Sequence, residues 1–329
     1  MMTQPTVLIT TRSFGKEVRE PLERLQREGC RIVEWREGSG VPESDLLAKV
    51  GEADAWIVAF HPIGPALLDR APRLRIIAKH GVGVDNIDIA AATERRIVVT
   101  TAPSANDQAV ADLAMALLLA LLRRIPEASA SVKAGRWDRF VGHGLSGKRL
   151  GILGLGRIGQ NVARRAKGFG VELLGADPVW PEDAAREIGI RRVDIRDLLA
   201  ESEIISLHAP LTPETEGLIG EHEIALMKPG VWIVNTSRGK VVNEKAMYEA
   251  LASGKIAGYA TDVFETEPPA GSPLLSLPNV IGTPHMGTHT RESIRCMGDR
   301  VVGAVLGVLR GERPEHVVNP EVWEHRKAL

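Results

Sequence analysis

Three side chains that could together move a proton and hold an anion follow predicted β-strands in the second half of the chain. Arg238, Glu267 and His285 each come within four residues of the end of such a strand. In a parallel sheet the carboxyl ends of the strands share one edge, and ligands bind beyond that edge. We therefore expect a guanidinium, a carboxylate and an imidazole to meet there.

These residue types fit the transfer of a hydride between a 2-hydroxy acid and a 2-oxo acid. The substrate oxygen must gain or lose a proton, and histidine titrates near neutral pH. A carboxylate on the other ring nitrogen would fix the tautomer and favour the protonated ring, which makes Glu267 the expected partner of His285. The planar donors of Arg238 could bind the substrate carboxylate and polarise its carbonyl group.

Each of the three residues also has a structural interpretation. Arg238 could form an ion pair, and Glu267 could be a solvated carboxylate like its neighbour Glu265. His285 follows Pro284 and could cap a turn. Their joint position at three neighbouring strand ends favours the catalytic interpretation.

A glycine-rich turn precedes these strands. Residues 149–153 are typical of a buried strand and lead into Gly154, Gly156 and Gly159, which form a Gly-x-Gly-x-x-Gly pattern before a helix. The first glycine permits a tight turn, the second lets a pyrophosphate approach the backbone, and the third lets the helix pack on the strand. The strand and helix around it favour a dinucleotide site over a purely structural turn.

Asp177 ends the next predicted strand, residues 171–176. It lies about 20 residues beyond the glycines, where a carboxylate can accept the ribose hydroxyls of NAD and repel the extra phosphate of NADP. Because Pro178 follows, Asp177 could also be an ordinary turn or cap residue. The pattern favours NAD as the cofactor.

The composition indicates a globular protein of two domains. The chain has 329 residues, of which 44% are hydrophobic and 25% charged. The net charge of −1 gives no support for binding to nucleic acid or membranes. Two cysteines, Cys30 and Cys296, are too few for a disulfide framework, and the amino terminus lacks a signal-peptide pattern. We expect a cytoplasmic protein with reduced thiols.

The first hundred residues alternate short strands with helices, which predicts a second parallel sheet covered on both faces. The predicted strands are Val7–Thr10, Arg31–Trp35, Ala55–Phe60, Leu74–Ala78 and Ile97–Thr100. A long helix is expected next, with Ser104 as its N-cap and Arg124 near its end. It is apolar nearly all round, which predicts a domain or subunit contact. An amphipathic helix over residues 293–309 is expected to return to the first domain.

Five motifs occur in the order typical of one enzyme family. They are Gly81-Val82-Gly83-Val84-Asp85-Asn86-Ile87-Asp88, Gly154-Leu155-Gly156-Arg157-Ile158-Gly159, Asn235-Thr236-Ser237-Arg238-Gly239, Asp262-Val263-Phe264-Glu265-Thr266-Glu267-Pro268 and Thr283-Pro284-His285-Met286-Gly287. On these motifs the chain resembles the D-isomer-specific 2-hydroxyacid dehydrogenases, within which D-3-phosphoglycerate dehydrogenase and hydroxypyruvate/glyoxylate reductase are the most similar types.

The resemblance implies an α/β fold in which a Rossmann NAD-binding domain, residues 103–286, is inserted into a discontinuous, flavodoxin-like, parallel-sheet substrate domain. That second domain would comprise residues 1–102 and 287–329. It implies a homodimer formed through the cofactor domains. It also implies reversible hydride transfer between NAD(H) and a small anionic 2-oxo or 2-hydroxy acid, as in D-3-phosphoglycerate dehydrogenase. Hydroxypyruvate/glyoxylate reductase, or a reductase of another anionic 2-oxo acid, is the alternative.

The resemblance further implies individual roles. His285 would be the acid/base, Glu267 its partner and Arg238 the substrate anchor. Contacts to the cofactor would come from Gly154, Gly156, Arg157, Ile158, Gly159, Asp177, Ala209, Pro210, Thr236, Asp262, His285 and Gly287. Asp262 would be directed towards the carboxamide. The substrate would be bound by Lys79, Arg238 and the backbone of Val82 and Gly83.

The chain departs from the family pattern at Lys79, where phosphoglycerate enzymes often have arginine. Arg12 follows the first strand, so Arg12 and Lys79 could hold a second anionic group. On that basis we expect a phosphorylated or otherwise dianionic substrate. No serine-sensing regulatory domain is expected.

A function of another class stays open at this point, because the same fold occurs in NAD-sensing, corepressor-like binding proteins. The intact set of Arg238, Glu267 and His285 favours an enzyme. His285 and His289 lie four residues apart, but without a third ligand nearby we expect no metal site.

Overall fold

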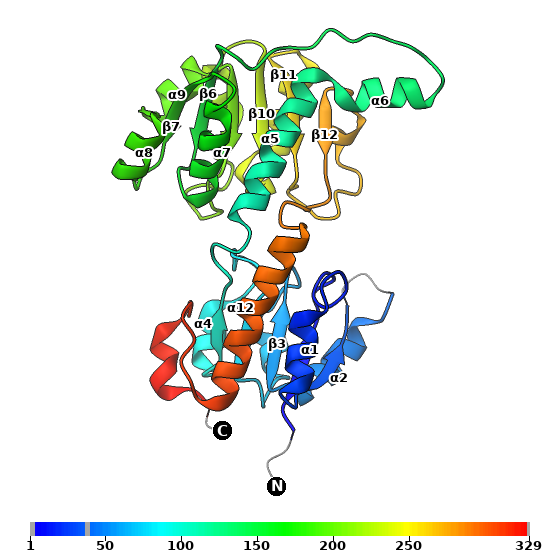
Figure 1. Cartoon of the computed structure of the whole chain (residues 1–329), viewed down its shortest axis with the longest axis vertical. Helices are drawn as coiled ribbons and strands as arrows, with labels where there is room; N and C mark the ends of the chain where they lie inside the picture. The colour runs from blue at the N-terminus through cyan, green and yellow to red at the C-terminus, as the bar shows by residue number, and fades with distance from the viewer. Residues whose placement is uncertain (1–3, 37–39, 328–329) are drawn as a thin grey trace. The chain divides into compact units, whose positions relative to one another are not determined.

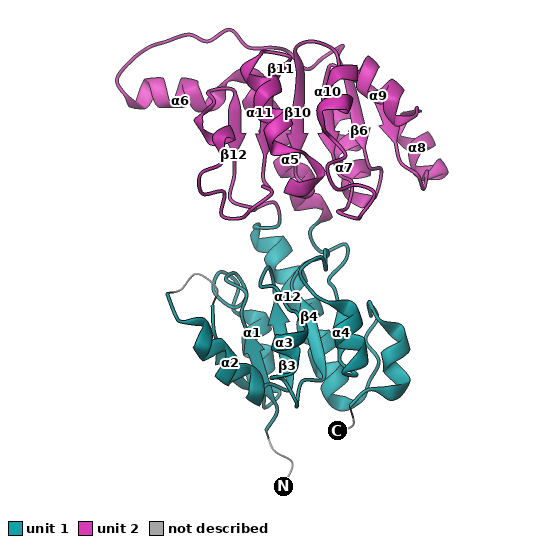
Figure 2. Cartoon of the chain, turned by 180° about the vertical axis from the view of Figure 1, so that it is seen from behind, with its two compact units in different colours: residues 1–106, 288–329 teal, residues 107–287 magenta. Residues whose placement is uncertain are grey.

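The computed structural model describes residues 4–36 and 40–327. Residues 1–3, part of the segment that predicts no signal peptide, lie outside this description. The chain divides into two compact units (Figure 2): unit 1 comprises residues 1–106 and 288–329, and unit 2 comprises residues 107–287. The unit boundaries thus follow Asn106 and Gly287, whereas the family resemblance implies boundaries after residues 102 and 286.

Unit 1 contains a five-stranded parallel sheet with the order β2-β1-β3-β4-β5, the flavodoxin-like arrangement. Its strands are β1 (Thr6–Ile9), β2 (Arg31–Glu34), β3 (Ala55–Val58), β4 (Ile76–Lys79) and β5 (Val98–Thr100). Its helices are α1 (Glu20–Arg27), α2 (Glu43–Glu52), α3 (Pro65–Leu68), α4 (Ile89–Glu94) and α12 (Arg291–Arg310), with a 3₁₀ helix at Pro320–His325.

Side chains alternate between the two faces of this sheet, so each face has its own core. Val7 and Ile9 face a core completed by α1 and α12, which lie side by side (Figure 1). Leu8 faces the opposite core, to which α2, α3 and α4 contribute. Because β1, β3 and β4 are buried along their whole length, the polar residues that follow them are held on a rigid layer.

Unit 2 contains a seven-stranded parallel sheet with the order β12-β11-β10-β9-β6-β7-β8. Its strands are β6 (Arg149–Leu153), β7 (Glu172–Ala176), β8 (Arg191–Arg192), β9 (Ile204–Leu207), β10 (Val231–Asn235), β11 (Ile256–Thr261) and β12 (Val280–Gly282). Its helices are α5 (Asp107–Arg123), α6 (Ile125–Lys133), α7 (Arg157–Lys167), α8 (Glu182–Ile188), α9 (Ile195–Glu201), α10 (Glu221–Leu226) and α11 (Glu244–Ala252), with 3₁₀ helices at Gly239–Val241 and Pro273–Ser276.

The order of this second sheet reverses beside β6, since β7 and β8 extend it on one side and β9 to β12 on the other. Ligands of open α/β sheets bind at such a switch point, outside the carboxyl ends of the strands. Helices α5, α7 and α8 cover one face and α9, α10 and α11 the other. The sheet therefore presents the loops after β6, β7, β9, β10, β11 and β12 along one edge.

The region around α5 differs from its prediction. Ser104 does not stand at the N-cap position, because α5 begins only at Asp107; its φ of 59° lies in the left-handed region and turns the chain before the helix. Helix α5 ends at Arg123, and Arg124, with φ of 55°, separates it from α6, a further helix that the sequence did not predict. Pro126 lies in the first turn of α6, where a proline is tolerated.

The described helices give no candidate for a membrane span, because none of them is both long and apolar enough.

Candidate active site

His285 and Glu267 form a hydrogen-bonded pair in unit 2. The Nδ1 atom of His285 lies 2.7 Å from Oε2 of Glu267, and the side chains are 21% and 33% exposed. The other carboxylate oxygen, Oε1, accepts the main-chain N–H of Phe264 at 3.1 Å. A carboxylate anchored in this way fixes the orientation of the imidazole ring. The structure thus brings together two of the three predicted catalytic residues.

The loop that carries His285 is held by Asp262, which follows β11 and is 2% exposed. Its Oδ1 accepts the hydroxyl of Thr283 at 2.6 Å and the N–H of Met286 at 2.8 Å. Its Oδ2 accepts the N–H of Gly287 at 2.7 Å. The carboxylate expected to face the carboxamide of a cofactor therefore binds the loop between β12 and α12.

Arg238 lies in the loop after β10 and is partly buried. This loop is closed by Asn235, whose Nδ2 donates to the carbonyl oxygen of Arg238 and whose Oδ1 accepts the N–H of Ser237. A Cβ on Gly239 would lie 1.9 Å from the carbonyl carbon of Phe264, so only glycine lets the loops after β10 and β11 touch. The sheet edge thus places Arg238 beside the segment that carries Glu267.

The glycine turn after β6 leaves space for a bulky ligand. Gly154 adopts φ of 91°, and a Cβ on Gly159 would lie 2.1 Å from the carbonyl oxygen of Gly154. A Cβ on Gly156, in contrast, would meet no heavy atom within 4 Å. Helix α7 begins at Arg157 without a side-chain cap, so its first N–H groups lie at an open, positively polarised end. These features fit the pyrophosphate of a dinucleotide.

Asp177 follows β7 and contacts the same turn. Its Oδ2 accepts the N–H of Leu155 at 2.6 Å, and its Oδ1 accepts the N–H of Val179 at 2.7 Å. The carboxylate is therefore fixed beside the glycine turn, as a ribose-binding group requires. Because each carboxylate oxygen has a further lone pair, these bonds leave room for ribose hydroxyls.

Two buried polar atoms follow β9 and β10 and find no hydrogen-bond partner in the described part of the chain: Nδ1 of His208 and Oγ1 of Thr236. Burial lowers the pKa of His208 to about 4, so its ring is neutral near pH 7. Ala209 is buried and Pro210 exposed beside it. Unpaired buried groups of this kind fit a missing ligand. His208 is the kind of residue that the rule of reactive side chains after strands can identify, since it directly follows β9.

In unit 1, Lys79 is 5% exposed at the end of β4. Its ammonium group donates to Oδ1 of Asn86 at 2.5 Å and also to the carbonyl oxygen of Ala59. Nδ2 of Asn86 donates to the carbonyl oxygens of Ala59 and His61. Lys79 thus ties the end of β3 to the glycine-rich loop after β4. That loop leaves Val82 exposed and Gly83 partly exposed.

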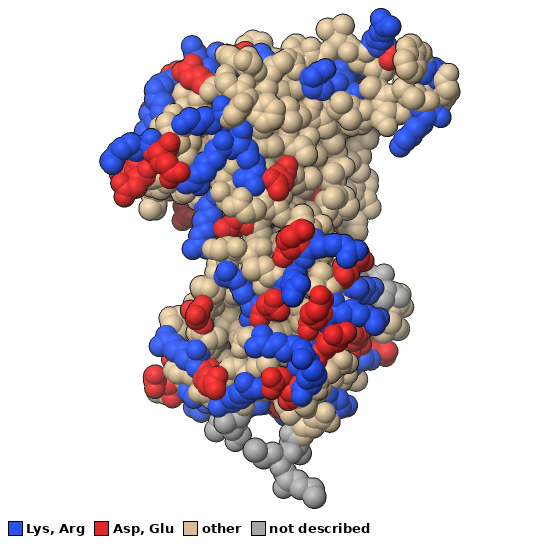
Figure 3. Space-filling model, viewed as in Figure 1, with Lys and Arg blue, Asp and Glu red and all other residues tan. Residues whose placement is uncertain are grey.

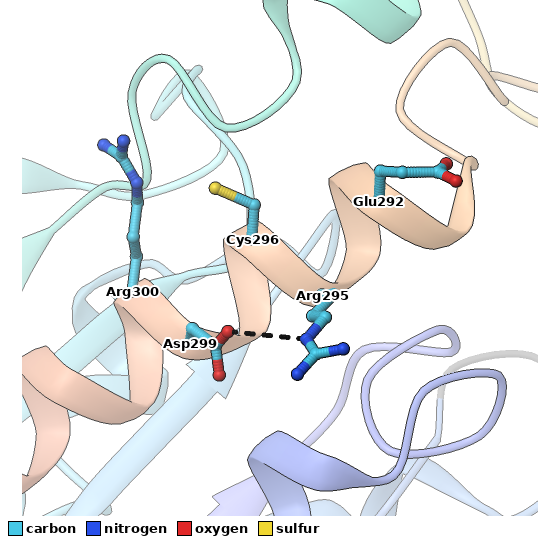
Figure 4. Close-up of a pocket in the computed structure, with 5 residues that line it drawn as sticks. All are labelled: Glu292, Arg295, Cys296, Asp299 and Arg300. Carbon is cyan, nitrogen blue, oxygen red and sulfur yellow. Dashed lines mark ion pairs between the residues drawn. The ribbon is translucent and has the colours of Figure 1, made fainter.

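Two concave regions are lined by none of these residues. One, of about 480 Å³, runs along α12 and is lined by Glu292, Arg295, Cys296, Asp299 and Arg300. Figure 4 shows Arg295 pointing towards Asp299, with 4.0 Å between Nε and Oδ2. The other, of about 330 Å³, lies at the amino ends of β6, β9 and β10 in unit 2. The catalytic pair of His285 and Glu267 lies at the opposite edge of that sheet.

Comparison with known proteins agrees with this geometry. Residues 115–287 match the D-isomer specific 2-hydroxyacid dehydrogenase NAD binding domain. The chain is 48% identical to D-3-phosphoglycerate dehydrogenase of Methanocaldococcus jannaschii, over 88% of this chain and 56% of that protein. It is 44% identical to glyoxylate reductase of Thermococcus litoralis, over 91% and 96% of the two chains.

One solved structure is similar to this chain over nearly its whole length. Aquifex aeolicus D-lactate dehydrogenase, complexed with NAD and lactic acid, gives a TM-score of 0.81 at 32% identity and covers 93% of this chain and 96% of that one.

The chain belongs to the D-isomer specific 2-hydroxyacid dehydrogenase family. Its cofactor is NAD, and it is an oxidoreductase that acts on 2-hydroxyacids. The predicted family, α/β fold class, cofactor and enzymatic character are confirmed. Among its relatives, the chain spans about half the length of the M. jannaschii dehydrogenase and nearly all of the T. litoralis reductase.

Proposed function

We propose that this dehydrogenase interconverts a small 2-oxo acid and its D-2-hydroxy acid, with His285 as the acid/base. The observation that carries the proposal is the 2.7 Å pair between His285 Nδ1 and Glu267 Oε2. Because Nδ1 of His285 is hydrogen-bonded to the Glu267 carboxylate, Nε2 is the ring nitrogen that exchanges a proton with the substrate oxygen. Bound NAD(H) supplies or accepts the hydride.

In the reducing direction, the carbonyl oxygen of the 2-oxo acid becomes an alkoxide and takes a proton from the imidazolium of His285. In the oxidising direction, the neutral ring takes the hydroxyl proton. Glu267 stabilises the charged ring in either direction. Arg238 binds the substrate carboxylate and polarises the carbonyl group. In unit 1, substrate contacts are proposed for the backbone of Val82 and Gly83.

His285→Ala tests the proton transfer directly. We expect kcat to fall about 10²- to 10⁴-fold while the NADH dissociation constant, measured by fluorescence titration, changes little. Turnover close to that of the wild type would remove His285 as the proton donor.

For the substrate tail, we propose an uncharged group, as in glyoxylate or hydroxypyruvate. This rests on Lys79, the cation expected to bind a distal anion, which is buried and donates to Asn86 and Ala59. Because its ammonium group donates to the oxygens of Ala59 and Asn86, we propose that Lys79 stabilises the loop after β4 and does not bind a substrate phosphate. The identity with the T. litoralis glyoxylate reductase agrees with this proposal.

A D-3-phosphoglycerate dehydrogenase is the second candidate. Arg12, in the loop after β1, has an exposed side chain that could bind a phosphate. The M. jannaschii relative favours the same substrate class.

A substrate panel separates the two candidates. NADH oxidation is followed by absorbance with glyoxylate, hydroxypyruvate and phosphohydroxypyruvate, for the wild type and for Arg12→Ser. We expect the highest kcat/KM with an uncharged tail and little effect of Arg12→Ser. A kcat/KM at least tenfold higher for phosphohydroxypyruvate, lost in Arg12→Ser, would reject this proposal in favour of the second. Absence of NADH oxidation with all three would reject both.

We also propose that the enzyme is a homodimer joined through unit 2. In Figure 3 the surface beside α5 is mostly uncharged, whereas Lys and Arg side chains lie around α6. In α6 and the segment after it, Ile125 and Val132 are each 54% exposed, Trp137 79% and Val141 92%. Exposed apolar side chains that gather on one segment, here α6 and the residues after it, are typical of a subunit interface. Trp137→Ser with Val141→Ser should shift the mass measured by light scattering from two chains to one; a wild-type monomer would contradict the proposal.

A further inference from the structure

Two large apolar side chains are exposed at the edge where the sheet of unit 1 can meet a ligand. Phe60 follows β3 and is 45% exposed, and Val82 follows β4 and is 42% exposed. Strands β3 and β4 are neighbours in the parallel sheet, with Val58 paired to Lys79 (Figure 2). Both side chains therefore lie at the carboxyl edge of this sheet, where open α/β sheets bind their ligands.

The segment around Phe60 is fixed to the loop after β4. The side-chain amide of Asn86 donates to two carbonyl oxygens, that of Ala59 at 3.1 Å and that of His61 at 2.7 Å. These are the residues on either side of Phe60. The buried ring of His61 also packs on Trp35, with 5.3 Å between the ring centroids. A side chain on a backbone fixed in this way binds a ligand at a lower cost in conformational entropy.

The ring of Phe60 lies close to the positive charge of Lys79. Nζ of Lys79 is 5.7 Å from the ring centroid, in the range of a cation–π contact. The ammonium group is buried and donates to Asn86 and to the carbonyl oxygen of Ala59. After β3 and β4, this edge therefore exposes an aromatic ring and the side chain of Val82, while the charge of Lys79 is covered.

We infer that the preferred substrates are 2-oxo acids with an apolar side chain, which packs on Phe60 and Val82. The inference rests on the proposed function and narrows its uncharged tail to an aliphatic or aromatic one. Because that function already places the substrate against the backbone of Val82 and Gly83, the tail can reach the side chains of the same edge. Burial of an apolar tail there removes apolar surface from water on both partners, whereas a hydroxyl or phosphate on the tail would lose hydration.

A series of 2-oxo acids with growing apolar tails tests this inference. Pyruvate, 2-oxobutanoate, 4-methyl-2-oxopentanoate and phenylpyruvate are compared by the absorbance of NADH. We expect kcat/KM to rise by at least about tenfold from pyruvate to the better of the two largest substrates, because each buried methylene adds binding energy in the transition state. A kcat/KM that stays level or falls from pyruvate to both of them would overturn the inference.

Phe60→Ser tests the aromatic residue itself. It should lower kcat/KM for 4-methyl-2-oxopentanoate by about 10- to 100-fold and leave that for glyoxylate, which has no tail, within about twofold. Phe60→Leu keeps an apolar side chain and should retain most of the activity with both. Phe169→Ser is the matched control, because Phe169 is 43% exposed after α7 in unit 2 and should affect neither substrate. Equal losses with the two substrates in Phe60→Ser would mean that Phe60 supports the loop and does not bind the tail.

Val82→Ser gives an independent test should Phe60→Ser fail to fold. Hydroxypyruvate and 2-oxobutanoate have tails of similar size, but only the first carries a hydroxyl group. In Val82→Ser, kcat/KM for 2-oxobutanoate should fall by about three- to tenfold relative to that for hydroxypyruvate. An unchanged ratio would contradict recognition of an apolar tail by this edge.

Glyoxylate separates the inference from the proposed function. Oxidation of NADH with glyoxylate that is lost in His285→Ala supports the function whatever tail is preferred. If glyoxylate is reduced and larger apolar tails are not favoured, the inference alone fails. If none of these 2-oxo acids is reduced, the proposed function fails and the inference falls with it.

Discussion

Glu265 and Glu244 exchange hydrogen bonds, since the carboxylate of each accepts the main-chain N–H of the other at 2.8 Å. Two residues further on, Glu267 instead accepts from Phe264 and from His285. The two neighbouring carboxylates thus have separate tasks. Glu265 joins its loop to the start of α11, and Glu267 orients the imidazole. They form a matched pair for mutation.

Glu267→Gln should lower kcat by about 10- to 100-fold, because the amide keeps a hydrogen-bond acceptor but loses the charge that stabilises the imidazolium. Glu265→Gln is the control and should keep kcat within twofold. Steady-state rates with a 2-oxo acid and NADH measure both. An equal loss in the two variants would show that loop structure, and not the pair with His285, explains the effect.

Arg238→Ala should raise KM for the 2-oxo acid and lower kcat/KM by about 10²- to 10³-fold, because the carboxylate loses a charged donor fork. Arg238→Lys should recover only part of this, since a lysine lacks the paired, planar donors. Lys240→Ala, an exposed cation in the same loop, is the control. If Lys240→Ala raises KM as strongly, general electrostatic attraction would replace specific binding as the explanation.

Alanine substitutions at two glycines of the turn after β6 should have different effects, one on stability and the other on cofactor binding. Gly159→Ala would place a Cβ 2.1 Å from a carbonyl oxygen, so the free energy of unfolding should fall by about 1–3 kcal/mol. Gly156→Ala meets open space and should leave the thermal midpoint nearly unchanged while raising the NADH dissociation constant at least tenfold. Thermal unfolding and fluorescence titration test this. Tight NADH binding by Gly156→Ala would mean that the pyrophosphate lies elsewhere.

Asp177→Asn should shift cofactor preference towards NADP, because it removes the charge that repels a 2′-phosphate. It keeps an acceptor for the N–H of only one of Leu155 and Val179, so the thermal midpoint should fall slightly while the fold is retained. The readout is the ratio of kcat/KM with NADH to that with NADPH, which we expect to fall at least fivefold. A constant ratio would count against the proposed ribose contact.

Stability should fall below neutral pH because of His80, which is 6% exposed at the start of the loop after β4. Burial lowers its pKa to about 4 from 6.5. Between these values the unfolded chain binds the proton and the folded chain does not, so the free energy of unfolding decreases as pH falls. From pH 7 to pH 5, His80 alone should lower the free energy of unfolding by about 2 kcal/mol.

The comparison with His80→Asn isolates that contribution. Urea unfolding of unit 1 at pH 7 and at pH 5, followed by a probe in that unit, should show a smaller decrease in the variant than in the wild type. Equal decreases would mean that His80 is protonated in the folded state or that other groups dominate.

Local sequence was sufficient wherever the signal depends on a short stretch of chain. The buried strands predict the two parallel sheets, and the spacing of Gly154, Gly156 and Gly159 predicts the turn and helix that follow. The order of reactive residues after strands also predicts that His285 and Glu267 share one sheet edge. Hydrophobic periodicity, the residue types of turns and the order of strands predict these features, and none of them requires contacts between distant segments to be known.

Only the tertiary structure decided how the polar atoms of those residues are used. Ser104 is a residue type that often caps helices, but here it adopts a left-handed φ and turns the chain before α5. The charged groups of Lys79 and Asp262 bind Asn86 and the loop around His285, contacts that the sequence alone does not predict. A charged group takes the partners that lie nearest in space, and those partners are set by packing between segments far apart in the chain.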